Sequence, residues 1–295
     1  MIARESLLLQ SFAALRPVDA SVPVSAALPN GAVRAGAPSV ADPLELLLDP
    51  LPAADRARFP RPRRVVRRAQ GFAIEFGEGA TLPGALTAEQ REQLAPSTRE
   101  VDGRPVARAA VPIAGLLFDP RGRWLPRRFA ANVARGATLP LGLFPAAAHV
   151  ARTRSGELSG RLALEDGRPL PFAHATLTVT VVGRDPVVLE AQSDRDGALL
   201  FPLQALPALP VGGAPHDAQL RVRGARPLPE FEAARREGRL HDPEELRRHA
   251  VDVALLVDAT LRSGAAFALS LPFTVAPGAP QRLVADGSPL IVRLP

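Results

Sequence analysis

Residues 156–206 read GELSGRLALEDGRPLPFAHATLTVTVVGRDPVVLEAQSDRDGALLFPLQAL, and their pattern is the clearest indication of fold in the chain. An alternating run ends at residues 166–169 (DGRP). A run rich in β-branched residues follows, and residues 193–197 (SDRDG) lead into another apolar run. Asp-Gly pairs supply the positive φ of tight turns, and period-two alternation is typical of half-buried strands. The stretch therefore predicts short strands packed as a β-sandwich.

The composition of the whole chain favours the same fold class. The 295 residues are 46% hydrophobic and 22% charged, which suits a globular protein long enough for two domains. The 32 prolines and 23 glycines are spread without a period, which favours many short elements joined by turns. We expect a mainly β protein with two β-sandwich-like domains, the second carrying a short helical insert.

The charge is distributed unevenly between the two halves. Residues 1–150 hold 19 arginines against 13 acidic residues, whereas residues 151–295 hold 17 of each. We therefore place a domain boundary near residue 150. The expected parts are a Pro/Ala-rich N-terminal arm (1–43), a basic β-rich domain (44–150) and a neutral sandwich (151–295) with its insert at 227–249.

Local patterns predict the individual elements. Asp242 followed by Pro243, Glu244 and Glu245 predicts a helix start inside the insert. Residues 87–96 predict a short helix that begins with a capping box and stops at Pro96. The apolar runs predict strands at 44–48, 71–76, 106–117, 123–134, 138–144, 158–164, 174–182, 186–192, 198–203, 218–223, 251–261, 265–275 and 289–294.

A D-G-x-P turn recurs at residues 102–105, 166–169 and 286–289, each time before an apolar run. One interpretation is a tandem duplication of one module. The other is independent use of a favourable turn in a chain rich in these residues.

The residue types exclude several kinds of chemistry. The chain has no cysteine, and all 36 basic residues are arginines. Disulfides, thiolate catalysis, cysteine-bound metal and lysine chemistry are therefore excluded. Residues 194–197 (DRDG) imitate the start of a calcium loop, but no acidic residue follows before Asp217, which favours a plain turn. We predict no catalytic residue, no cofactor and no metal site.

Two arginine clusters are the candidate partner-binding residues. Residues 56–68 contain seven arginines in thirteen positions, and a second cluster surrounds the single tryptophan. The first run is consistent with docking on an acidic protein surface, with a solvated edge strand guarded by charge, or with nucleic-acid binding. The scarcity of aromatic residues disfavours nucleic acid. The candidates are Arg61, Arg63, Arg64, Arg67, Arg68, Arg123, Trp124, Arg127 and Arg128.

The N-terminus only partly imitates a signal peptide. Arg4 precedes an apolar run, but Glu5 lies beside that charge, and Arg16-Pro17 ends the run early. No stretch approaches the length of a membrane helix. We expect synthesis in the cytoplasm, no membrane span, and a place in a particle assembled in the cell or released from it.

The second half resembles a known family. Residues 160–162 (GRL), 166–170 (DGRPL), 173–179 and 193–201 (SDRDGALLF) are similar to the carboxypeptidase regulatory-like domain. This resemblance implies a transthyretin-like β-sandwich and a non-catalytic module attached to a larger protein or assembly. In addition, residues 123–129 (RWLPRRF) before such a domain are similar to proteins that accompany contractile phage-tail-like injection systems.

Two functions follow as hypotheses. The first is a non-enzymatic structural or adaptor subunit of a larger assembly, such as a phage-tail-like contractile injection particle. The second is a sandwich module that binds carbohydrate or a surface polymer. Sugar sites favour exposed Trp or Tyr, and the chain has one Trp and no Tyr, which favours the adaptor. The sequence does not indicate any small-molecule ligand.

Overall fold

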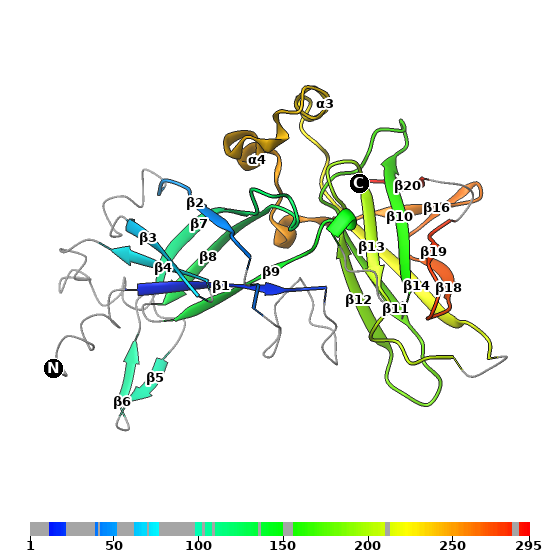
Figure 1. The fold of residues 1–295 in the computed structure, drawn as a ribbon, viewed down its shortest axis with the longest axis horizontal. Coiled ribbons are helices and arrows are strands. Elements are labelled where there is room, and N and C mark those ends of the chain that lie inside the picture. Colours follow the sequence, from blue (N-terminus) through cyan, green and yellow to red (C-terminus); the bar gives the residue numbers. More distant parts are fainter. Residues whose placement is uncertain are drawn as a thin grey trace.

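The fold is mainly β, as the sequence predicts, and forms two sandwich-like domains side by side (Figure 1). It is seen in a computed structural model. The residues that it describes are 12–21, 39–40, 42–51, 62–69, 71–76, 98–101, 104–107, 110–134, 137–149, 156–209, 213–284 and 289–295. The helix expected at 87–96 lies outside the described residues, as do residues 102–103 and 286–288 of two of the D-G-x-P turns.

Two sheets face each other in the N-terminal domain, in the orders β3-β4-β1-β9 and β2-β7-β8. A separate hairpin joins β5 to β6. Buried residues of both sheets form one core, including Leu15, Ile74, Leu117 and Phe129. The strands are β1 (Phe12–Asp19), β2 (Glu45–Leu48), β3 (Pro62–Arg68), β4 (Gly71–Phe76), β5 (Thr98–Val101), β6 (Arg104–Ala107), β7 (Ala110–Phe118), β8 (Arg127–Ala134) and β9 (Thr138–Leu143).

Strand β1 corrects the expected boundary of the N-terminal arm. It lies inside its sheet, antiparallel to β4 and parallel to β9, so residues 12–19 belong to the N-terminal domain. Ala13 and Leu15 are buried in the core while Ala14 and Arg16 are half-buried, so the strand keeps a period of two. The Pro/Ala-rich composition around it conceals this short alternation.

The C-terminal domain is also a pair of packed sheets. One has the order β13-β10-β20-β16-β17 with β19 beside β10, and the other is β12-β11-β14 with β15 and β18 both paired to β14. Their core contains Leu162, Leu177, Phe201 and Leu220, all fully buried. The strands are β10 (Glu157–Leu164), β11 (His174–Val179), β12 (Val187–Gln192), β13 (Ala198–Pro202), β14 (His216–Gly224), β15 (Val257–Asp258), β16 (Thr260–Ser263), β17 (Ala266–Ala268), β18 (Leu271–Val275), β19 (Gln281–Arg282) and β20 (Leu290–Arg293).

The turn at residues 193–197 forms as its sequence predicts. Gly197 has φ +74°, and a Cβ there would lie 2.3 Å from the carbonyl oxygen of Leu162, so only glycine fits. The Asp194 carboxylate accepts the backbone N–H groups of Asp196 and Ala198, both at 2.9 Å. Burial raises the pKa of Asp194 above its usual value. This carboxylate therefore serves the turn itself.

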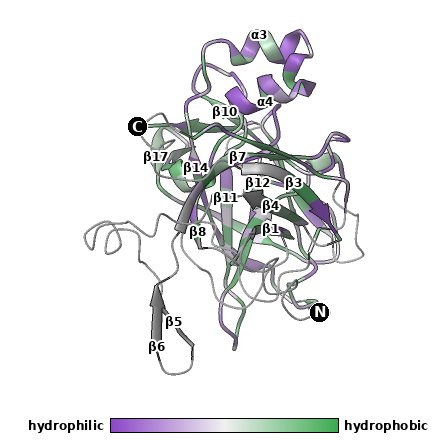
Figure 2. Ribbon diagram, turned by 90° about the vertical axis from the view of Figure 1, so that its left-hand side faces the viewer, coloured by the Kyte–Doolittle hydropathy of each residue, from purple (hydrophilic) through white to green (hydrophobic). Residues whose placement is uncertain are grey.

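The helical insert consists of α3 (Phe231–Arg236), η3 (Arg239–His241), α4 (Pro243–His249) and η4 (Val253–Leu255). Asp242 caps α4 by accepting the Glu244 N–H at 2.7 Å, as the sequence predicts. Figure 1 shows the insert reaching from the C-terminal sandwich towards β7, and Figure 2 shows that its helices are mainly hydrophilic. Such polar helices depend on a few apolar contacts for their position.

Two expected strands near the insert are wrong in extent. The strand expected at 251–261 starts only at Val257, because Asp252 instead caps η4 by accepting the Ala254 N–H. The strand expected at 265–275 is divided into β17 and β18, which pair with different strands in different sheets. A continuous apolar pattern does not reveal where a chain changes sheets.

Phe172 connects the sandwich to its insert. It is the only non-glycine residue with positive φ in the described part of the chain, at 54°. Its side chain is buried against Phe231 of α3, with ring centroids 6.2 Å apart in an edge-to-face arrangement. A left-handed backbone is costly for phenylalanine, so this packing must offset the strain.

Replacing Phe172 by alanine should destabilise the protein by about 3 kcal/mol, as expected for a buried phenylalanine. Phe172→Gly should be more stable than Phe172→Ala by about 1 kcal/mol, because glycine removes the strain of the positive φ. Urea unfolding measures both differences. The control pair is Phe201→Ala and Phe201→Gly in β13, where glycine should be the less stable variant. The same order of stability at both sites would contradict the role of strain at Phe172.

Candidate functional site

The first arginine cluster lies on strand β3, at the edge of its sheet. Four of the seven residues of β3 are arginines, and β3 pairs only with β4 in the described sheet. Arg67 and Arg68 are exposed, whereas Val65 packs against the core. Arg63 and Arg64 occupy backbone positions earlier in the strand, and Arg61 lies outside the described residues. The solvated-edge interpretation agrees with this position.

Asp42 links the first cluster to the second. Its backbone carbonyl accepts Nη2 of Arg67 at 2.7 Å. Its carboxylate pairs with Nη1 of Arg123 at 2.7 Å and accepts the indole N–H of Trp124 at 2.6 Å. Arg123 also meets the buried Asp119 at 3.1 Å. These bonds direct Arg123 and Trp124 towards the interior of their own domain.

Arg127 is a buried arginine near the boundary of the two domains. Its side chain donates from Nη1 to the carbonyl oxygen of Gly142 at 2.6 Å, and the residue is 8% exposed. Burial lowers the pKa of the Arg127 guanidinium, and the carboxylates of Asp252 and Glu190 oppose this shift. Both acidic residues belong to the C-terminal half. Arg127 therefore contributes to the electrostatic contact between the domains.

Arg128 makes the direct connection between the domains. Its Nη2 pairs with the Asp49 carboxylate, its Nη1 donates to the carbonyl oxygen of Arg247 at 2.8 Å, and its backbone N–H donates to Val251 at 3.3 Å. Arg247 also approaches the other Asp49 oxygen at 3.7 Å. Asp49 thus lies between an arginine of β8 and an arginine of α4.

An apolar cluster lies beside these ion pairs. Leu116 and Phe118 on the outer face of β7 are buried against Leu246 and Ala250 of the insert. The insert therefore packs on the N-terminal sheet, and the Asp49 pairs lie at the border of the contact. We call the ion pairs of Asp49 together with this apolar cluster the clasp.

His174 lies at a second contact between the domains. Its ring is 5.5 Å from that of Phe144, and the residue is 3% exposed. Neither ring nitrogen has a hydrogen-bond partner within the described structure, and the Glu190 oxygen is 3.8 Å away. Burial lowers the pKa of His174 to about 4, with smaller contributions from Arg223 and Arg127. At 3.8 Å the Glu190 carboxylate does not offset the burial of the ring.

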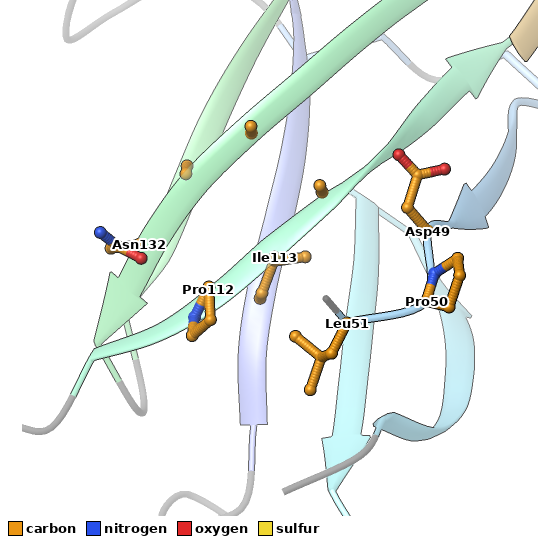
Figure 3. Close-up of a pocket in the computed structure, with 9 residues that line it drawn as sticks. Asp49, Pro50, Leu51, Pro112, Ile113 and Asn132 are labelled. Carbon is orange, nitrogen blue, oxygen red and sulfur yellow. The ribbon is translucent and has the colours of Figure 1, made fainter. Parts of the chain in front are cut away.

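Two hollows open on the outer face of β7 and β8. The first has a volume of about 320 Å³ and lies beside Asp49 and Pro50, which directly follow β2 (Figure 3). The second has a volume of about 380 Å³ and is bordered by the insert through Val251, Leu255 and Leu256. Both share Ala114 and Ala130, whose small side chains form the floor between them. The two hollows are therefore adjacent parts of one largely apolar depression.

The described residues give no indication of a metal site or of a membrane-spanning helix. They contain no group of three His, Asp or Glu side chains arranged to hold a metal ion. Among the same residues, no helix is both long and apolar enough to cross a membrane. Asp196, in the turn that imitates a calcium loop, pairs with Arg235 of α3 at 2.7 Å and with Arg195 at 3.9 Å.

Comparison with known proteins does not identify a relative. No family model, no curated protein and no solved structure matches the chain.

Sequence reasoning missed several residues that organise the domain contact, namely Asp49, Phe144, His174, Leu246 and Arg247. In the sequence, Asp49 belongs to an Asp-Pro pair that directly follows the strand β2. Leu246 is a single apolar residue on a short polar helix. The available signal was the helical insert itself, since a short polar helix with one apolar position needs a surface to cover. No local pattern indicated which surface that was.

Acidification should destabilise the fold through His174. Its pKa is lowered on folding, so the unfolded chain binds the proton more readily, and stability should fall as the pH decreases from about 6.5 to about 4. The loss attributable to this ring is about 3 kcal/mol at most. Urea unfolding of the protein and of His174→Gln across this range measures it. The variant should lose less stability on acidification, and identical pH profiles would contradict the assignment.

Proposed function

We propose that the protein is a non-enzymatic adaptor subunit that docks on an acidic surface of another protein within a larger assembly. The observation that carries this proposal is the position of the arginine-rich strand β3 at the edge of its sheet. Arg67 and Arg68 are exposed there, beside the two earlier arginines of the strand. Arginine is favoured at protein interfaces because its guanidinium bonds carboxylates in a bidentate manner.

The second arginine cluster takes a different role in this proposal. Arg123, Arg127 and Arg128 bond groups of their own chain, and Trp124 bonds Asp42. These residues support the shape of the adaptor, and docking is left mainly to β3. The clasp supports the proposal, because an adaptor that holds two parts of an assembly at a fixed distance needs its own two domains fixed relative to each other.

The resemblance of residues 160–201 and 123–129 to known families extends this proposal. We propose that the C-terminal sandwich is a carboxypeptidase regulatory-like domain and that the assembly is a contractile phage-tail-like injection particle. Carbohydrate binding has less support, because the single tryptophan donates its indole N–H to Asp42 and is half-buried.

The adaptor proposal is tested by co-expressing the protein with each of the proteins that are encoded next to its own gene. We expect one neighbour with an acidic surface to co-purify and to form a complex in size-exclusion chromatography. Replacing both Arg67 and Arg68 by alanine should weaken that complex about tenfold or more, because two interfacial cations are lost.

The matched control replaces Arg184 and Arg226, which are exposed arginines of the C-terminal half, by alanine. This control removes the same charge from a different surface and should leave the complex intact. Equal weakening by both double variants would place the docking site elsewhere than on β3. If the protein forms no complex with any of the proteins encoded beside its gene, the proposal that it is an adaptor is contradicted.

A further inference from the structure

The outer edge of β8 presents backbone groups that point away from its sheet. Ala114 of β7 lies directly opposite Ala130 of β8, and the Ala114 carbonyl accepts the Asp49 N–H on the far side of β7. The backbone groups of Ala114 therefore face β2, so those of Ala130, directly opposite, face away from β7. Since this direction alternates along a strand, Arg128 and Asn132 share it.

Part of this edge is already paired within the chain. The outward N–H of Arg128 donates to the carbonyl oxygen of Val251 at 3.3 Å. Ala130 and Asn132 follow at the next two outward positions, and both are exposed. Their outward backbone groups have no hydrogen bond to any other part of the described structure. Within the described residues, the pairing begun by Val251 therefore does not extend to Ala130 and Asn132.

The two edge strands β3 and β8 differ in the features that protect them from pairing with strands of other chains. Strand β3 carries four arginines, starts with Pro62 and has a register shift between Pro62 and Arg64. Charge, proline and bulges are the usual means by which edge strands avoid pairing with other chains. In β8, residues 129–134 read FAANVA, without charge or proline, and pair with β7 in unbroken register. This segment of β8 therefore has no charge, proline or bulge to protect it from strand pairing.

The apolar depression lies along the same segment. Ala130 belongs to the floor of both hollows, and Leu255 on the insert side is 77% exposed. A strand added beside β8 would direct alternate side chains to this outer face. Aliphatic side chains at those positions would fill the space above the alanines and cover Leu255, which favours an apolar, uncharged occupant.

We propose that the β8 edge binds an extended segment of a partner protein by strand addition at Ala130 and Asn132. The segment is uncharged, lacks proline at the pairing positions and carries aliphatic side chains at alternate positions. It continues the pairing that Val251 begins at Arg128. This surface is distinct from β3, so the proposal does not depend on the docking of an acidic partner there.

A capped peptide of alternating threonine and valine is the probe. It should bind the full chain and slow amide hydrogen exchange at Ala130 and Asn132, measured by NMR. Exchange at Ala131 and Val133 should change little, because their amides already face β7. Alternate N-methylation of the peptide removes the donors for strand pairing and should abolish binding.

Ala130→Pro removes one outward N–H without removing a bond to β7, and proline is tolerated at such a position. It should weaken peptide binding about tenfold or more, whereas Ala130→Ser should bind as the unaltered chain does. If Ala130→Pro fails to fold, the N-methylated peptide on the unaltered chain decides. No binding, equal binding of the methylated peptide, or binding without protection of Ala130 would each overturn the proposal. Replacing Arg67 and Arg68 by alanine should leave peptide binding unchanged, which separates this site from β3.

Discussion

The carboxylate of Asp49 is the contact on which the arrangement of the two domains depends. It lies at the end of β2 and meets Arg128 of β8 and Arg247 of α4. Isolated surface ion pairs contribute little to stability, but here one carboxylate serves two arginines at the border of a buried apolar cluster. The apolar cluster supplies most of the attraction, and the ion pairs fix where α4 sits on β7. The insert of one sandwich thereby becomes part of the other domain's surface.

This arrangement gives the three arginine sites of the N-terminal domain different roles. Arg127 and Arg128 are used within the chain, and Arg123 holds the loop at Asp42. Arg67 and Arg68 of β3 lie exposed at a sheet edge, although Arg67 also donates to the carbonyl oxygen of Asp42. Charge at such an edge opposes unwanted strand pairing, and we propose that it also attracts an acidic surface. The β8 edge, on the second sheet of the same sandwich, lacks such protection. If the protein is the adaptor that we propose, one charged and one uncharged edge would let it contact two partners of different chemistry at once.

The features that the sequence predicted correctly are those with local causes. The turn at residues 193–197 depends on an aspartate carboxylate and a glycine within four residues, and the start of α4 depends on Asp242 and the proline after it. The clasp joins Asp49 to Arg128, 79 positions away, and to Arg247 in the insert of the other domain. Its formation depends on the register of β7 with β8, which places Leu116 opposite Arg128. The arginine cluster at 123–128 was visible as charge, but its partners could be found only once the strands were paired in space.

The distance between the two domains tests the clasp most directly. Because the chain has no cysteine, spin labels on cysteines introduced at the exposed positions Thr138 and Val182 report a single distance by pulsed electron paramagnetic resonance. We expect the clasp to give one narrow distance distribution, which broadens in Asp49→Ala and stays narrow in the control Asp166→Ala, whose carboxylate pairs with Arg168 on the surface. A broad distribution in the unaltered chain, or an unchanged one in Asp49→Ala, would contradict it.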